Sequence, residues 1–335
     1  GDHRDLHSFP TRRSSDLGVL LRYNGREWRD ASDGVRLIGC LWGTSGANLY
    51  SGGAAAGGEG GFIRRFDGSG WRDEAVDPAA PIHGLWGDGR GSLFAAGGSR
   101  ATCGILYRFD GRSWQEAWRQ PEETLNQGLR ALWTGPGGRA AAVGDGGRLL
   151  RFDGASWSAL DSGVRTSLRG VRGMNGQLWI VDETGAVRRY DGMRWEALSE
   201  GGLKSRLNAV WGCPEPDDPG QTRLVAVGEK GAIFVFRGGA WETAESGTTV
   251  DLKDVFGTSL SDIHAVGVGG ALLHFDGSLW RPLPSPTTSN LWGIWGASGA
   301  AFYAVGDANT ILHFDGWQWR KMDDDPERKI GRAPV

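Results

Sequence analysis

A short pattern occurs eight times along this chain of 335 residues. Each copy has an aromatic residue, a turn pair that ends in glycine, and a tryptophan three residues after that glycine. The eight tryptophans are Trp28, Trp71, Trp114, Trp157, Trp195, Trp241, Trp280 and Trp319. Neighbouring tryptophans lie 38 to 46 residues apart, so the chain is built from units of one similar length.

The last unit shows how one repeat is organised. Short runs at 291–296, 301–306, 310–314 and 318–321 alternate in side-chain character and are bounded by Gly, Asp, Asn and Ser. This pattern predicts four β-strands rather than helices. The Asp-Gly pair between the last two strands suits a two-residue hairpin turn, because such a turn needs positive φ. Gly-rich units of four strands are typical of a β-propeller, in which each unit forms one blade.

Seven units carry all four strands, whereas residues 18–28 hold only the two outer strands of an earlier unit. The complete units span 37–73, 82–116, 129–159, 168–197, 207–243, 252–282 and 291–321. We therefore predict an all-β fold, a seven-bladed β-propeller of four-stranded antiparallel blades with an extra N-terminal half-blade. The alternative is an incomplete eight-bladed ring. Because the last unit ends on its own fourth strand, we expect imperfect closure and self-association through an open edge.

The two ends of the chain lack the repeat. Residues 1–17 look like a translated sequencing adapter, so we interpret them as a non-native or disordered leader and expect the true N-terminus, with any signal peptide, to be missing. Residues 18–321 form the predicted propeller. Residues 322–335 are charged and without the pattern, and we interpret them as a disordered tail.

Composition argues against several functional classes. The 37 basic and 40 acidic residues are spread along the chain and give a net charge of −3, which is not the footprint of a nucleic-acid-binding protein. No apolar run is long enough to span a membrane. Cys40, Cys103 and Cys213 form no C-x-x-C pair, so the sequence predicts neither a disulfide framework nor a zinc site. No metal or cofactor is expected.

One large aromatic residue stands at the same place in the first strand of most units. These residues are Trp42, Trp86, Trp133, Trp211, Phe256 and Trp295. We expect each ring to lie wedged against the neighbouring blade, where burial of an aromatic residue stabilises the fold. Arg172 occupies this place in the fourth unit, and its cation is expected either over a neighbouring tryptophan or in a looser blade.

The units resemble the blades of a bacterial β-propeller repeat family with the pattern W-G, A-V-G-D, F-D-G-x-x-W. Variants of the central motif stand at 142–145, 226–229, 265–268 and 304–307. The hairpin is similar to those of sialidase Asp-box repeats and photosystem II assembly-factor repeats. Such repeats are common in secreted and cell-envelope proteins, so the resemblance implies an extracytoplasmic location. It implies no particular activity, since propellers host unrelated functions.

Two sets of repeated positions vary in chemistry and are the candidate binding residues. The first strand should start, and the second strand should end, at the same mouth of the central channel. The positions are His83, Arg130, Arg169, Asn208, Lys253 and Trp292 in the first set and Asp145, Glu183, Glu229 and Asp307 in the second. Packing alone does not require such diversity, so we predict that this mouth recognises a ligand. A solvated polar rim without a ligand is the alternative.

Two other rings of repeated residues have structural explanations. The aspartate of the turn pair is expected to accept hydrogen bonds from turn N–H groups rather than to bind a metal. The position before the aromatic residue of the third strand carries Arg22, Arg65, Arg108, Arg151, Arg189, Val235, His274 and His313. We expect these long side chains to cover neighbours and pair with carboxylates rather than to hold an anion.

The sequence favours a noncatalytic scaffold that binds a protein partner through one face of the propeller. A glycan-binding lectin is the alternative, because Trp118, Trp292 and Trp317 lie outside the repeated slots and aromatic faces stack on sugars. Trp179 is expected in the core. No nucleophile, phosphate-binding or metalloprotease motif is present, so an enzyme is not predicted and a glycosidase-like activity is a distant third reading.

Overall fold

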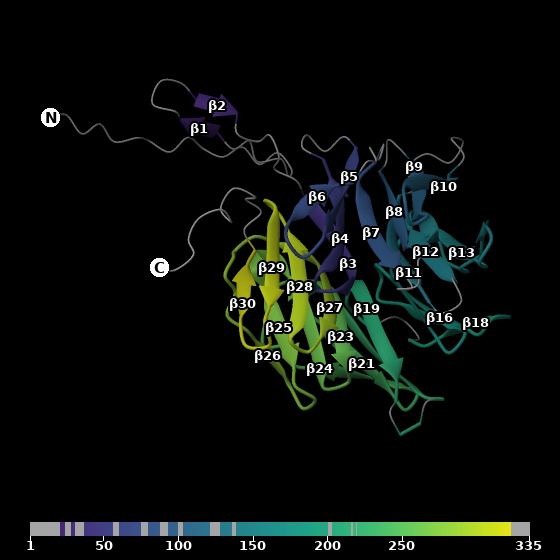
Figure 1. Ribbon diagram of the computed structural model, residues 1–335. Coiled ribbons are helices and arrows are strands. Elements are labelled where there is room, and N and C mark those ends of the chain that lie inside the picture. The colour runs from purple at the N-terminus through teal and green to yellow at the C-terminus, as the bar shows by residue number, and fades with distance from the viewer. Residues whose placement is uncertain are drawn as a thin grey trace.

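The computed structural model describes residues 21–23, 28–30, 37–55, 60–74, 80–87, 93–99, 103–120, 128–135, 139–199, 203–215, 217–218 and 220–322. These residues form seven four-stranded antiparallel sheets, arranged as the blades of a ring (Figure 1). The predicted seven-bladed β-propeller is therefore confirmed. Within the described ranges, no helix is long and apolar enough to cross a membrane. The leader 1–17 and the tail 323–335 lie outside the described residues.

The strands of each blade pair in chain order, from the innermost to the outermost. Blade 1 contains β3 (Leu37–Ser45), β4 (Asn48–Ala54), β5 (Gly61–Phe66) and β6 (Trp71–Asp73). Blade 2 contains β7 (Ile82–Gly87), β8 (Leu93–Ser99), β9 (Cys103–Phe109) and β10 (Trp114–Arg119). Blade 3 contains β11 (Leu129–Thr134), β12 (Ala140–Gly144), β13 (Leu149–Phe152) and β14 (Trp157–Ala159). Blade 4 contains β15 (Leu168–Met174), β16 (Gln177–Asp182), β17 (Val187–Tyr190) and β18 (Trp195–Ala197).

The last three blades follow the same plan. Blade 5 contains β19 (Leu207–Pro214), β20 (Thr222–Gly228), β21 (Ile233–Arg237) and β22 (Ala240–Ala244). Blade 6 contains β23 (Leu252–Ser259), β24 (Asp262–Gly267), β25 (Leu272–Phe275) and β26 (Trp280–Pro282). Blade 7 contains β27 (Leu291–Ser298), β28 (Ala301–Gly306), β29 (Thr310–Phe314) and β30 (Trp319–Lys321). Short 3-10 turns follow three second strands: η3 (Asp145–Gly147), η4 (Glu229–Gly231) and η5 (Val268–Gly270).

The ring closes by direct packing of blade 7 against blade 1, which lie beside each other in Figure 1. The Tyr303 hydroxyl donates a hydrogen bond to the carbonyl oxygen of Gly46 at 3.4 Å. Trp295 also reaches blade 1, because a Cβ atom on Gly43 would lie 3.2 Å from its ring. The expected imperfect closure is therefore wrong, as is the incomplete eight-bladed ring, and self-association through an open edge loses its structural basis.

The N-terminal half-blade forms a sheet of its own. β1 (Leu21–Tyr23) pairs in antiparallel register with β2 (Trp28–Asp30), and this two-stranded sheet shares no strand with a blade. The seven complete units therefore supply every strand of the ring.

The contact between blades is made by a tryptophan of one inner strand and a glycine of the next inner strand. A Cβ atom on Gly173 would lie 2.2 Å from the Trp133 ring, and one on Gly257 would lie 2.9 Å from the Trp211 ring. Only a residue without a side chain allows the indole of the preceding blade to come this close. The predicted wedge between blades is confirmed at these positions.

The turn between the third and fourth strands is longer than predicted. In blade 1 the strands pair at Phe66 and Trp71, so four residues form the loop. Asp67 Oδ1 accepts hydrogen bonds from the backbone N–H groups of Ser69 and Gly70, at 2.9 and 3.1 Å. Equivalent bonds are made by Asp110, Asp153, Asp191, Asp276 and Asp315. The predicted turn-capping role of the aspartate is confirmed, but the two-residue loop is wrong in these blades.

Blade 5 shows what happens without the aspartate. Here Arg237 pairs with Ala240, and only Gly238 and Gly239 form the loop, both with positive φ (60° and 86°). Two successive residues with positive φ are the requirement of a type I′ turn, which glycine meets without strain. The aspartate therefore selects the four-residue loop by satisfying its N–H groups.

We predict that Trp211→Ala lowers the free energy of unfolding by about 3–5 kcal/mol, because the substitution leaves a large cavity between blades 5 and 6. Trp211 is 3% exposed, whereas Trp317 is 88% exposed and serves as the matched control. Urea unfolding followed by fluorescence measures both. Trp317→Ala should change stability by less than about 0.5 kcal/mol. Equal effects of the two substitutions would contradict the wedge.

A second prediction concerns acid stability. Hydrogen bonds from Ser69 and Gly70 lower the pKa of Asp67 from 3.8 to about 2. A carboxylate with a depressed pKa stabilises the fold above its unfolded pKa, and that contribution disappears as pH falls toward the folded value. Asp67→Ala should therefore reduce the melting temperature at pH 7, with a difference that shrinks between about pH 4 and pH 2. A difference that stays constant over this range would refute the explanation.

Candidate functional site

Backbone hydrogen bonds place the two candidate sets at one mouth of the channel. The residue that follows a second strand donates its N–H to the carbonyl oxygen of the residue before the first strand of the same blade. Asp145 bonds to Gly128, Glu229 to Arg206, and Asp307 to Asn290, each at 3.0 Å. The first strand starts beside this bond, so both candidate sets surround one opening.

Two blades hold an arginine against an acid at the mouth. Arg130 makes a bidentate ion pair with Asp145, with nitrogen to oxygen distances of 3.0 and 2.9 Å. Arg169 donates to Glu183 at 3.0 Å. Burial alone would raise the pKa of Glu183, but hydrogen bonds from Arg169 and from the backbone N–H of Ser167 lower it overall. These charges are therefore fixed in position and partly neutralised before any ligand arrives.

Arg206 is a mouth residue that the sequence analysis missed. It precedes β19 and lies between two blades, with guanidinium nitrogens 3.6 Å from both Glu183 and Glu229. Its Nε also donates to the Glu183 carbonyl oxygen at 3.3 Å. Its place just before the repeated variable position was the available signal, because strand ends at one mouth collect neighbouring side chains.

The other side of the mouth is linked from blade 5 to blade 7. Asn208 Nδ2 donates to the carbonyl oxygen of Leu252 at 2.7 Å. Lys253 lies over the ring of Trp292, with its nitrogen 5.6 Å from the ring centroid. The Trp292 indole donates to Asp307 at 2.5 Å, while its side chain stays 37% exposed. Trp292 therefore presents an oriented, accessible aromatic surface.

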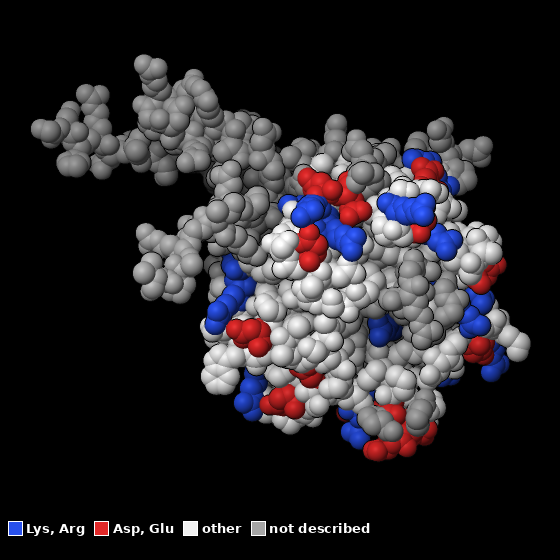
Figure 2. Space-filling view, viewed as in Figure 1, with Lys and Arg blue, Asp and Glu red and all other residues white. Residues whose placement is uncertain are grey.

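His83 completes the mouth in blade 2. A ring nitrogen of His83 lies 2.9 Å from the carbonyl oxygen of Gly98. Burial lowers the pKa of His83, so the ring is neutral near pH 7. The mouth therefore holds paired cations and anions beside neutral polar groups. Figure 2 shows Lys and Arg close to Asp and Glu at several places on the face in view.

The next layer of the channel consists mainly of small residues, because the inner strands come close together here. A Cβ atom on Gly170 would lie 3.2 Å from the backbone nitrogen of Val210. Asp254 is the exception, and its carboxylate accepts the N–H groups of Val255 and Ile294 at 2.8 and 2.9 Å. Burial raises the pKa of Asp254 to about 7. The carboxyl group joins blade 6 to blade 7 and is partly protonated at neutral pH.

The far part of the channel is filled by side chains that meet across the ring. Trp86 of blade 2 contacts Phe256 of blade 6, with centroids 5.9 Å apart, and Phe256 lies 6.5 Å from Trp295. The Arg172 guanidinium lies 5.5 Å from the Trp86 ring centroid. This is the position over a neighbouring tryptophan that the sequence analysis gave as one of two possibilities. We call Trp86, Arg172, Phe256 and Trp295 the plug. These side chains occupy the channel at this depth, and Trp86, Arg172 and Phe256 line the cavity behind the mouth.

Arg172 is held by the plug without a charged partner. It makes no hydrogen bond or ion pair to any described residue, and burial lowers its pKa to about 10. Thr134 of blade 3 stands where other blades have the glycine that receives the ring of the preceding blade. This substitution explains why the Trp86 ring of blade 2 takes a different position. Trp86 donates its indole N–H to the Thr134 carbonyl at 3.0 Å.

The mouth, the small-residue layer and the plug enclose a cavity of about 160 Å³. All six variable positions of the first set line it. Small-molecule pockets typically have about 300–1,000 Å³, so this cavity suits an inserted side chain better than a whole cofactor.

The remaining tryptophans do not form a shared surface. Trp179 is 1% exposed, which confirms its expected place in the core. Trp118 packs partly against the core of blades 2 and 3. Trp317 is exposed in the turn between β29 and β30, and this turn lies at the opposite end of the blade from Trp292. A sugar-binding platform that combines these rings is therefore absent from the described residues.

We predict that Arg172→Met raises the free energy of unfolding by about 1 kcal/mol, because it removes a desolvated cation without a hydrogen-bond partner. Arg169→Met is the matched control, since it removes a paired guanidinium and should lower the free energy by about 1 kcal/mol. Thermal and urea unfolding measure both variants. Destabilisation by Arg172→Met would show that the cation–π contact with Trp86 outweighs the cost of burying the guanidinium.

No protein-family model matches the chain, and no curated protein matches it in sequence. Solved structures do. YCF48 bound to D1 peptide is 18% identical with a TM-score of 0.62, over 84% of this chain and 93% of that one. YCF48 from Cyanidioschyzon merolae is 15% identical with a TM-score of 0.62, over 83% and 95%. The WD40 propeller domain of Doa1 is 11% identical with a TM-score of 0.65, over 83% and 92%. At these identities the likeness establishes the β-propeller fold, and the bacterial repeat family suggested by the motifs has no sequence match.

Proposed function

We propose that this protein is a noncatalytic scaffold that binds a peptide segment of a protein partner at the channel mouth. The observation that carries the proposal is the diversity of equivalent positions around one opening. Lys253 and Trp292 occupy the same place in neighbouring blades, yet one is a cation and the other an aromatic residue. Seven-fold packing does not require this difference, whereas recognition of an asymmetric ligand does.

The geometry favours a protein segment over a small molecule. The cavity behind the mouth is small and ends at the plug, so a ligand lies over the opening and inserts at most a side chain. Paired cations and anions offer directional hydrogen bonds without a large net charge. Trp292 adds an aromatic anchor of the type that contributes strongly to protein interfaces. The structurally similar YCF48, which was solved with a D1 peptide, supports a peptide as the class of ligand.

A glycan remains the rival ligand, but the arrangement of tryptophans gives it less support. Lectin propellers need an aromatic face beside each sugar pocket, and Trp292 is the exposed tryptophan of the mouth among the described residues. Trp317 lies at the other end of its blade. A glycosidase-like enzyme has no support from the mouth, because its acids are bound to arginine, asparagine or tryptophan donors.

Two matched ion pairs test the proposal. Arg130→Ala with Asp145→Ala removes a bidentate pair at the mouth, and Arg223→Ala with Glu215→Ala removes a bidentate pair at the opposite face. Removing both partners avoids leaving an unpaired charge. Peptides selected from a displayed random library on the wild-type protein provide the probe. We expect the mouth variant and Trp292→Ala to weaken peptide binding by about tenfold, or 1.4 kcal/mol, and the opposite-face variant to bind like the wild type.

Fluorescence anisotropy of the selected peptides gives the dissociation constants, and melting temperatures confirm that each variant is folded. Binding that survives at the mouth and fails with the opposite-face variant would contradict the proposed site. A glycan array separates the rival: a sugar bound at several equivalents, with no peptide selected, would favour the lectin.

The extracytoplasmic location implied by the repeat resemblance is also a proposal. Cell fractionation of the source organism with an antibody against the propeller tests it. Recovery from the envelope or medium supports the location, and recovery with the cytosolic fraction contradicts it.

A further inference from the structure

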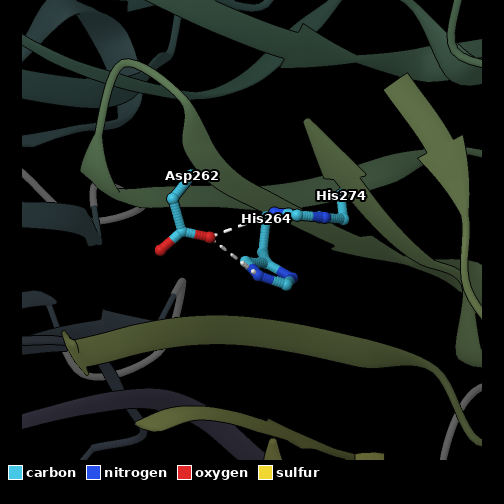
Figure 3. Close-up of side chains that lie close together, drawn as sticks. All are labelled: Asp262, His264 and His274. Atoms are coloured by element: carbon cyan, nitrogen blue, oxygen red, sulfur yellow. Dashed lines mark hydrogen bonds and ion pairs between the residues drawn. The ribbon is translucent and has the colours of Figure 1, made fainter. Parts of the chain in front are cut away.

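The structure contains a cluster of metal-ligand side chains in blade 6, away from the channel. Asp262 starts β24, His264 follows on the same strand, and His274 lies beside it on β25 (Figure 3). One ligand atom from each residue lies within 4.8 Å of the other two. The sequence analysis missed this cluster because the two histidines are ten positions apart and meet only through strand pairing.

The distances resemble those of a tetrahedral site. Asp262 Oδ1 lies 3.0 Å from His274 Nε2 and 3.4 Å from His264 Nε2. Zinc ligands at about 2.0–2.1 Å from the ion are about 3.3 Å from each other in a tetrahedron. The two imidazole rings are stacked with centroids 4.4 Å apart. For both imidazole nitrogens to bind one ion, the His274 side chain must rotate. His274 is 29% exposed and has room to do so, whereas His264 is buried.

His264 itself indicates that a partner is missing from the cluster. It is 1% exposed and packed against Phe302 and Phe314, its Nδ1 has no hydrogen-bond partner among the described residues, and its Nε2 has only the long 3.4 Å contact with Asp262. A buried polar group without a partner is costly.

The carboxylate is already oriented for the site. Thr258 donates a hydrogen bond to Asp262 Oδ2 at 2.5 Å, which leaves Oδ1 facing the two imidazoles. Such an outer hydrogen bond is typical of metal-binding carboxylates. We propose that Asp262, His264 and His274 bind one divalent transition-metal ion of the zinc class, with a fourth position open to water or to a ligand.

Blade 1 provides substitutions that fit these slots. The positions of Asp262, His264 and His274 are occupied there by Asn48, Tyr50 and Arg65, in the same strand register. Arg65 Nε donates to Asn48 Oδ1 at 3.2 Å, and its guanidinium lies over the Tyr50 ring. In blade 7, His313 occupies the position of His274 and stacks on Tyr303, while Ala301 occupies the position of Asp262 and offers no carboxylate. His313→Arg is therefore the matched control.

The experiment titrates untagged, full-length protein with ZnCl₂ by calorimetry and with CoCl₂ by visible absorption. We expect one equivalent of Zn²⁺ with a micromolar or lower dissociation constant, an intense Co²⁺ spectrum of a tetrahedral site, and a higher melting temperature with Zn²⁺. His264→Tyr, His274→Arg and Asp262→Asn should each weaken Zn²⁺ binding by at least about tenfold, whereas His313→Arg should bind like the wild type.

Two results would overturn the proposal. One is the absence of a stoichiometric site in the wild type; the other is undiminished binding by both His264→Tyr and His274→Arg, which would assign the metal to other histidines. If His264→Tyr fails to fold, the partly exposed His274→Arg and Asp262→Asn still decide the outcome, and circular dichroism identifies that case.

Discussion

The contact between a tryptophan of one inner strand and a glycine of the next controls the spacing of the blades. Each blade is a separate sheet, so no strand of one blade pairs with a strand of the next. The ring therefore depends on side-chain packing between the inner strands. The same contact between Trp295 and Gly43 closes the circle without exchange of a strand. Each such contact needs a glycine on one side and a large flat ring on the other.

Departures from this contact shape the channel. Thr134 replaces a receiving glycine, Arg172 replaces a tryptophan, and Phe256 is smaller than the indole found elsewhere. The Arg172 and Phe256 side chains meet the Trp86 ring across the channel and form part of the plug. The plug therefore combines two departures from the repeat, Arg172 and Phe256, with two tryptophans of the regular series, Trp86 and Trp295. The plug forms the inner end of the cavity behind the mouth.

The sequence predicted the parts of the fold that depend on local pattern. The period predicted the blades, and strand direction predicted that His83 and Asp145 belong to one mouth, as the backbone bonds between strand ends require. The length of the Asp67 turn was predicted incorrectly, because an aspartate that accepts two N–H groups stabilises a longer loop than the Asp-Gly pair alone suggests. Contacts across the ring, such as Trp86 with Phe256, depend on the radius of the closed circle, which no single unit encodes.

Comparison of equivalent slots separates packing from chemistry within one chain. Tyr50 and Tyr303 fill this slot of the second strand with buried rings, whose faces pack against Arg65 and His313. His264 occupies the same slot but buries less apolar surface, because an imidazole is smaller than a phenol ring. Its two nitrogens also require hydrogen-bond partners. Asp254 makes a similar departure in a layer of small residues. Both residues belong to blade 6, which also carries Lys253 at the mouth. Blade 6 therefore departs from the repeat at two depths, and polar groups buried at such cost are characteristic of functional sites rather than of packing.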